Sequence, residues 1–146
     1  MIVIDTNVVS ELMRPSPAEA VRDWARSHDP RELCTTAVTV AEIRYGIERL
    51  REGRRKNVLK AAAAEIFEMF EEQIFPFDYV AAEQYALVVS QRDALGLPID
   101  GFDAQIAAIC RARETALATR NLVDFDKTGV EVINPWRTEP DPPRRP

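Results

Sequence analysis

The sequence predicts an α/β domain built on a largely parallel sheet, and two observations indicate this class. Short apolar runs without charge, typical of buried parallel strands, recur at Ile2–Ile4, Leu33–Val38, Thr115–Thr119 and Val130–Ile133. Segments with apolar residues at helical spacing lie between these runs, and such alternation favours a parallel sheet covered by helices. Of the four runs, only Val130–Ile133 contains a charge and alternates, so we place it at an edge of the sheet.

Five segments are predicted to be helices. Ala18–Ser27 follows Pro17, and we expect this proline in the first turn of the helix. The candidate N-caps of three later helices are Thr39, Asp78 and Asp100. The other four helices have stripes at helical spacing, which are apolar apart from Asp103. They lie at Val40, Ile43, Ile47 and Leu50, ended by Gly53; at Leu59, Ala62, Ile66 and Phe70, running to about Gln73; at Ala82, Tyr85, Ala86 and Val89, ending near Gly96; and at Asp103, Ile106, Ala107 and Cys110.

The length of 146 residues suits one domain with a proper core, which we place at residues 1–137. The segment from about residue 40 to residue 73 is long for one crossover, so we expect a helical hairpin that projects to one side. Residues 138–146 contain four prolines and no apolar anchor, and we expect this tail to be disordered.

Composition excludes several classes of protein. The net charge of −5 argues against a wholly basic nucleic-acid coat protein. The single His28 excludes HExxH zinc hydrolysis, and the widely spaced Cys34 and Cys110 exclude zinc ribbons and disulfide scaffolds. We find neither a signal peptide nor an apolar run of about 20 residues, so we expect a cytoplasmic protein without membrane contact. Any chemistry must therefore depend on carboxylates.

Four acids are expected to meet at one edge of the sheet. Asp5 ends the first strand, and Glu42 is expected in the first turn of the helix after the second. Asp103 is expected in the first turn of the helix before the third strand, which Asp124 follows by a few residues. In a parallel α/β sheet the helix starts lie at the carboxyl ends of the strands, where such folds place their sites.

Clustered carboxylates repel one another unless a cation binds them. Oxygen ligands without histidine or cysteine favour Mg²⁺, with Mn²⁺ as an alternative. The chemistry that follows is phosphodiester hydrolysis, with either one ion or two ions about 3.5–4 Å apart.

Each acid also has an ordinary structural explanation. Asp5 could cap a helix, Glu42 and Asp103 could be first-turn acids that the helix dipole favours, and Asp124 could be a loop residue. Asp100 is a rival for the role of Asp103. Only the joint placement favours a site. Neighbouring polar residues could orient the acids, although turn and capping chemistry explains them too and is the better explanation for Asn7 and Ser10; the set is Thr6, Asn7, Ser10, Thr119 and Asn121.

The charge is uneven along the chain. The window Arg44–Lys60 holds seven bases and two acids, so it carries +5 and the remainder −10. A solvated helical surface and a contact for phosphates beside the acidic site are both open readings of this window.

Four segments of the chain contain these acids: Met1–Glu11 (MIVIDTNVVSE), Val38–Gly46 (VTVAEIRYG), Phe102–Ala108 (FDAQIAA) and Thr119–Phe125 (TRNLVDF). Together they resemble the acid motifs of PIN-domain ribonucleases, particularly VapC-type toxins of the FitB-like branch. Ile133–Trp136 (INPW) also resembles that branch. The resemblance covers residues 1–137 and implies a PIN-like α/β/α sandwich with a central, mostly parallel sheet of four to five strands.

The resemblance implies specific roles for these residues. Asp5 and Asp103 would be the principal metal ligands, Glu42 and Asp124 would complete the catalytic site, and Thr6, Thr119 and Asn121 would support it. The activity would be Mg²⁺-dependent endonucleolytic cleavage of RNA, such as tRNA or another structured RNA. The protein would be a homodimeric toxin, inhibited by an antitoxin that brings an arginine to the acids and that alone binds operator DNA.

The antitoxin would also cover an apolar groove, which we expect on the 40–73 hairpin. Tyr45, Ile47, Phe67 and Phe70 are the candidates for its lining, with core packing the better role for Phe70.

Other classes fit less well. A haloacid-type phosphatase needs an aspartate where Asn7 stands, and a receiver domain needs an acid after a middle strand, which Leu33–Val38 lacks. A binding module without catalysis would not need all four acids.

Overall fold

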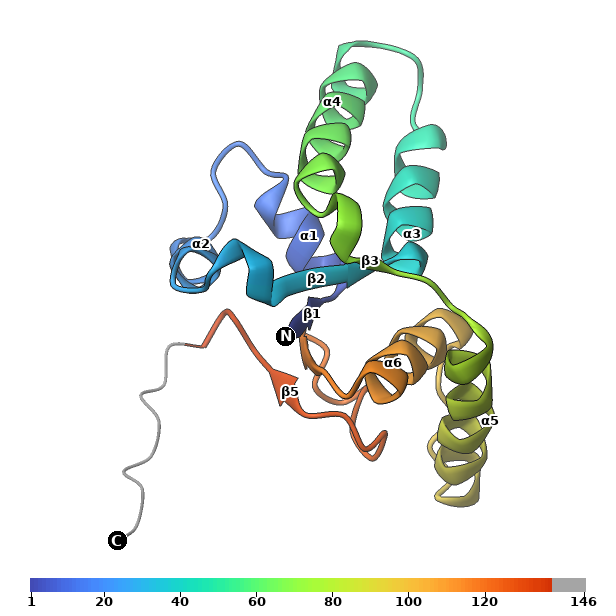
Figure 1. Ribbon diagram of the computed structural model, residues 1–146. Coiled ribbons are helices and arrows are strands. Elements are labelled where there is room, and N and C mark those ends of the chain that lie inside the picture. The colour runs from blue at the N-terminus through green and yellow to red at the C-terminus, as the bar shows by residue number, and fades with distance from the viewer. Residues whose placement is uncertain (138–146) are drawn as a thin grey trace, which may run out of the picture.

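The computed structural model describes residues 1–137 and has a five-stranded sheet at its centre (Figure 1). The strand order is β3-β2-β1-β4-β5, and every neighbouring pair is parallel. The strands are β1 (Ile2–Ile4), β2 (Leu33–Thr36), β3 (Ile74–Phe75), β4 (Ala116–Ala118) and β5 (Val132–Ile133). The carboxyl ends of all five strands therefore lie at the same edge of the sheet. The prediction of a mostly parallel sheet is confirmed, and β5 lies at an edge as expected.

Helices cover both faces of this sheet. They are α1 (Thr6–Leu12), α2 (Glu19–Arg26), α3 (Ala37–Glu48), α4 (Arg54–Met69), α5 (Tyr79–Ala94) and α6 (Gly101–Arg113). Two short 3₁₀ helices, η1 (Pro30–Glu32) and η2 (Glu71–Gln73), lead into β2 and β3. No helix within residues 1–137 is both long and apolar enough to cross a membrane.

Two apolar clusters, one on each face of the sheet, define the layers. Neighbouring strand residues alternate between them: Val3 packs with the side chains of α5 and α6, whereas Ile4 packs with those of α1 to α4. Leu117 and Ala118 of β4 alternate in the same way. In Figure 1, α5 and α6 lie below the sheet, and α1, α3 and α4 lie above it. The predicted α/β/α sandwich is confirmed.

Several predicted boundaries were wrong at the starts of helices. The strand predicted over Leu33–Val38 ends at Thr36, whose hydroxyl accepts from the Thr39 N–H at 3.1 Å, so Thr36 and not Thr39 caps α3. Glu42 therefore lies in the second turn of α3 instead of the first. Pro17 precedes the N-cap of α2 and is outside its first turn.

The sequence patterns also missed helix α1 and strand β3. Helix α1 has β-branched and polar residues with low helix propensity, but burial of Val8 and Val9 stabilises it. The two-residue strand β3 was too short to predict. The predicted caps Asp78 of α5 and Asp100 of α6 are confirmed, each accepting a backbone N–H.

The helices α3 and α4 form the predicted hairpin, which rises on one side of the sheet (Figure 1). Near its tip, Lys56 is 4% exposed and its Nζ donates to the Glu48 carbonyl at 3.1 Å and to Glu52 Oε1 at 2.7 Å. Lys60 pairs with Glu48 at 3.1 Å. Two bases of the Arg44–Lys60 window therefore hold the hairpin together.

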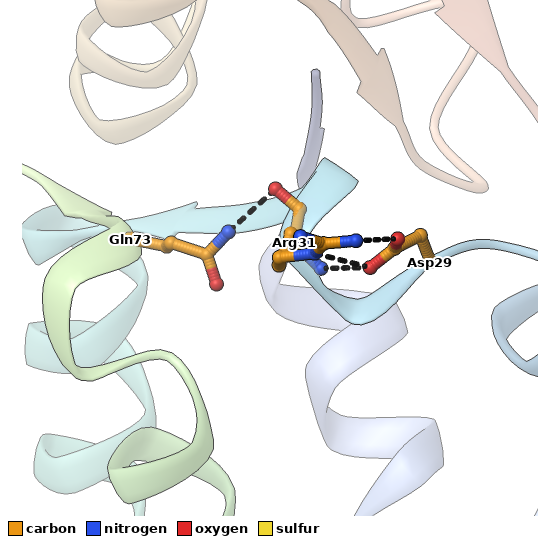
Figure 2. Close-up of polar contacts among 3 residues, drawn as sticks. All are labelled: Asp29, Arg31 and Gln73. Carbon is orange, nitrogen blue, oxygen red and sulfur yellow. Dashed lines mark hydrogen bonds and ion pairs between the residues drawn. The ribbon is translucent and has the colours of Figure 1, made fainter.

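Polar contacts join the segments that enter β2 and β3. Figure 2 shows that Gln73 of η2 donates to the Arg31 carbonyl of η1, at 2.7 Å. The Arg31 guanidinium donates to both carboxylate oxygens of Asp29, at 3.2 and 2.8 Å. These contacts help to align two neighbouring parallel strands. The tail, predicted to be disordered, lies outside the described residues.

Candidate active site

Three of the four predicted acids line one hollow at the carboxyl edge of the sheet. Asp5, Glu42 and Asp103 face a space of about 520 Å³. Asp124 lines an adjoining hollow of about 510 Å³, and its charge raises the pKa of both Asp5 and Asp103. The tertiary structure therefore brings together acids from four separate segments of the chain.

Asp5 is the most deeply placed of these acids, with only 2% of its surface exposed. It follows β1 directly and caps α1, with Oδ1 accepting the Thr6 N–H at 2.8 Å. Its Oδ2 accepts from the Thr119 hydroxyl at 2.7 Å and from Asn7 Nδ2 at 3.2 Å. Burial raises the pKa of Asp5, and these hydrogen bonds offset part of that rise. Asp5 thus both caps α1 and belongs to the acidic site.

Glu42 reaches the hollow from the second turn of α3. Its Oε1 accepts from the Thr6 hydroxyl at 3.0 Å, which joins two segments 36 residues apart. Burial raises the pKa of Glu42, and the charges of Asp5 and Asp100 add to the rise. Thr6 thus connects the carboxylates of Asp5 and Glu42, through its backbone N–H and its hydroxyl respectively.

Asp103 carries the largest of these perturbations. It lies in the first turn of α6, as predicted, and burial together with four neighbouring acids raises its pKa to about 7. Those neighbours are Asp5, Asp100, Asp124 and Glu42. Its rival Asp100 caps α6 by accepting the Phe102 N–H at 2.9 Å and does not line the hollow. The charge of Asp100 nevertheless contributes to the raised pKa of Asp103 and of Glu42. The geometry favours Asp103.

Polar side chains hold the acids in place. The Thr119 hydroxyl, fully buried after β4, donates to Asp5 and accepts from Asn7 Nδ2 at 3.0 Å and from the Asn121 N–H at 3.1 Å. Asn7 therefore has a role beyond forming a turn, because its side chain connects Asp5 with Thr119. Ser10 lines the hollow.

Sequence reasoning missed several residues of the site. The buried Thr39, expected only as a cap, lies 3.1 Å from the Thr6 hydroxyl. Arg14 and Arg120 line the hollow beside the acids, as does Trp136. The position of Arg120 between Thr119 and Asn121 was a signal that could have identified it.

The acids of this hollow offer oxygen atoms as candidate metal ligands, and hard cations prefer oxygen ligands. Within residues 1–137, no three acid, histidine or cysteine side chains gather closely enough to hold a metal ion by themselves. Mg²⁺ usually keeps several water molecules and takes one or two carboxylates, so a hydrated ion needs no tighter group. Burial, and after it the charges of neighbouring acids, raises the pKa of Asp103, and a bound cation would favour its charged form.

An apolar groove of about 950 Å³ adjoins the acids between α1, α3 and α4. Ile47 lines it as predicted, and Thr6 and Glu42 belong to both the groove and the acidic hollow. Tyr45 and Phe67 do not line it: Tyr45 is 68% exposed, whereas Phe67 is 6% exposed and packs in the core. Phe70 packs against the same core, as expected.

The fold of this chain is that of a known family. A family model described as the PIN domain matches residues 2–131, and the chain belongs to the PIN-domain family. Within it, the chain is similar to the toxin FitB of Neisseria gonorrhoeae, with 39% identity over 93% of this chain and 99% of the relative. It is 35% identical to the VapC ribonuclease Y4jK of Sinorhizobium fredii, over 93% of this chain and 98% of the relative.

A solved structure agrees with these sequence relatives. The structure of FitAB bound to an IR36 DNA fragment superposes with a TM-score of 0.90 and 38% identity, covering 97% of this chain and 99% of that one. The resemblance to VapC-type proteins of the FitB branch is therefore confirmed.

Proposed function

We propose that this chain is a Mg²⁺-dependent endoribonuclease and the toxin of a toxin–antitoxin pair. The observation that carries the proposal is the meeting of Asp5, Glu42 and Asp103 in one hollow, with Asp124 close enough to raise the pKa of two of them. The names of its relatives, a toxin and a VapC ribonuclease, support the same activity.

In this proposal, Asp5 and Asp103 would hold the ion, and Glu42 and Asp124 would complete the acidic site. The bound cation, Mg²⁺ or in its place Mn²⁺, would neutralise phosphate charge and make water a better nucleophile. Thr119 and Thr6 keep the carboxylate of Asp5 in one orientation through contacts of 2.7 and 2.8 Å. Asn121 supports the hydroxyl of Thr119 from the other side.

We propose the apolar groove beside the acids as the binding site of the antitoxin. Its continuity with the acidic hollow through Thr6 and Glu42 would let one extended segment place apolar side chains in the groove and an arginine among the carboxylates. Such an arginine would exclude metal. Operator DNA would bind only through the antitoxin, and the toxin would act as a cytoplasmic homodimer on tRNA or another structured RNA.

The test compares purified wild type with Asp5→Asn and Asp103→Asn in an RNA cleavage assay with Mg²⁺ or with EDTA. We expect cleavage by the wild type in Mg²⁺ alone, and a loss of at least about 100-fold in either variant. The matched control is Asp93→Asn, an exposed aspartate near the end of α5, which should cleave like the wild type.

Expression in a host without the antitoxin extends the test to toxicity. The wild type and Asp93→Asn should arrest growth, and the two site variants should not. Cleavage that persists in EDTA would contradict the metal requirement. A wild type that neither cleaves RNA in Mg²⁺ nor arrests growth would contradict the proposed function.

A further inference from the structure

Arg120 lies at the boundary between the two hollows that contain the acids. It lines the space that holds Asp5 and Asp103, and also the adjoining space that holds Asp124. It follows Thr119 directly, and its backbone N–H donates to Asn7 Oδ1 at 3.2 Å. The main chain of Arg120 thus belongs to the network that holds Asp5.

The side chain of Arg120 is held by an aromatic ring. Its guanidinium carbon lies 5.0 Å from the centre of the Trp136 ring, within the range of a cation–π contact. Trp136 is partly buried against the core and follows β5, which pairs with β4 in parallel register. The Thr119 N–H donates to the Ile133 carbonyl at 2.9 Å, so the ends of β4 and β5 stay together. The fold therefore brings Trp136 to Arg120.

The charge of Arg120 is not used in an ion pair within residues 1–137, although acids line both spaces around it. The other arginine of the hollow, Arg14, pairs with Glu11 at 3.5 Å. An arginine loses side-chain entropy when it is held in one place, and stacking on a ring reduces what remains to be lost on binding. Arg120 is consequently a preorganised cation whose charge is available to an anion.

The anion that fits this position is a backbone phosphate. A strand of RNA that crosses the acids carries phosphates on both sides of the one that is cleaved, and a guanidinium matches phosphate geometry with paired N–H donors. The carboxylates repel such a strand, so a fixed cation at their border would attract it and determine its path.

We propose that Arg120 binds an RNA phosphate next to the scissile one and that Trp136 is the positioning residue that holds Arg120 for this contact. This inference rests on the proposed ribonuclease function. It assigns Arg120 to substrate binding and leaves the chemical step to the acids.

The first test measures binding of a short mixed-sequence RNA oligonucleotide to Asp103→Asn protein over a range of salt concentrations. Adding Arg120→Gln should weaken binding about tenfold and reduce the slope of log K against log salt by about 0.7, the value for one phosphate contact on a single strand. The matched control Arg26→Gln removes an exposed arginine at the end of α2 and should change neither quantity.

The second test measures cleavage in Mg²⁺ in the otherwise wild-type protein. Arg120→Gln should raise KM about tenfold with little change in kcat, and Arg120→Lys should recover part of the loss. Trp136→Leu should raise KM by a smaller factor, and Trp136→Phe should restore it because an aromatic face remains. A merely structural role for Trp136 would lower thermal stability without this division between KM and kcat.

The outcomes separate this inference from the proposed function. If the wild type cleaves RNA but Arg120→Gln leaves KM and the salt slope unchanged, the role of Arg120 is refuted and the ribonuclease function stands. If the wild type cleaves no RNA, the proposed function fails, and the salt slope still decides whether Arg120 contacts phosphate. If the Asp103→Asn protein binds no RNA at any salt concentration, the role of Arg120 is refuted, and cleavage by the wild type decides the proposed function separately.

Discussion

Replacing Thr119 by valine would remove one hydroxyl from the centre of the acidic site with almost no change in shape. That hydroxyl donates to Asp5 Oδ2 at 2.7 Å in a fully buried position. It also accepts from Asn7 Nδ2 and the Asn121 N–H. Valine offers none of these contacts, so the exchange tests how the fold holds a buried carboxylate.

The expected magnitude follows from the charge of the acceptor. A hydrogen bond to a charged group contributes about 1.5–3 kcal/mol, whereas one between neutral groups contributes about 1 kcal/mol. Because the Thr119 contact lowers the pKa of Asp5, its loss should raise that pKa further. Thr119→Val should therefore lower the free energy of unfolding by about 2–3 kcal/mol at about pH 8, and by about 1 kcal/mol at a pH where Asp5 is protonated.

The assay is urea unfolding in EDTA, at about pH 8 and at an acidic pH where Asp5 is protonated. Thr119→Ser is the matched control. Serine keeps the hydroxyl and loses one methyl group, so its loss of stability should depend little on pH. Equal losses for Thr119→Val at both pH values would refute the reasoning. A loss for Thr119→Ser that matched Thr119→Val in size and pH dependence would refute it as well.

Three further predictions concern pH, the identity of the site acid and the core. In EDTA, stability should fall as pH rises from about 5 to about 8, because the pKa of Asp103 is about 7 when folded against 3.8 as its ordinary value. Mg²⁺ should reduce that fall in thermal unfolding, and a flat profile in EDTA would contradict the raised pKa. Asp100→Asn should keep RNA cleavage, because asparagine also caps helices, whereas Asp103→Asn should lose it. Leu117→Ala should cost about 2–5 kcal/mol in urea unfolding, against less than about 0.5 kcal/mol for Leu87→Ala, which is 47% exposed; similar losses would contradict the assignment of Leu117 to the core.

Much of the fold could be predicted because its elements have strong local patterns. Helices α5 and α6 carry apolar stripes and acidic caps, and the caps Asp78 and Asp100 are where the pattern placed them. Helix α1 could not be predicted in this way, since its stability comes from burial of Val8 and Val9 and not from helix propensity. The start of α3 was misplaced because the threonines Thr36 and Thr39 are both plausible caps, and only the length of β2 decides between them.

The location of the acidic site was also predictable from topology. In a parallel sheet every strand ends at the same edge, so Asp5, Glu42 and Asp103 had to lie near one another. Their contacts were not predictable in this way. The bond from Thr6 to Glu42 depends on the angle at which α3 packs on α1, and Asp124 lies in the adjoining hollow because of the loop after β4.

The sequence by itself determined the class of the fold, the edge of the sheet that carries the acids, and the family. Each of these is encoded in local periodicity, in the alternation of strands and helices along the chain, or in short motifs. The tertiary structure alone decided which side chains touch. Thr119 meets Asp5 across 114 residues, and Trp136 meets Arg120 through the pairing of β4 with β5. Such contacts follow from register and packing, which sum many weak interactions over the whole chain and leave no local pattern to read.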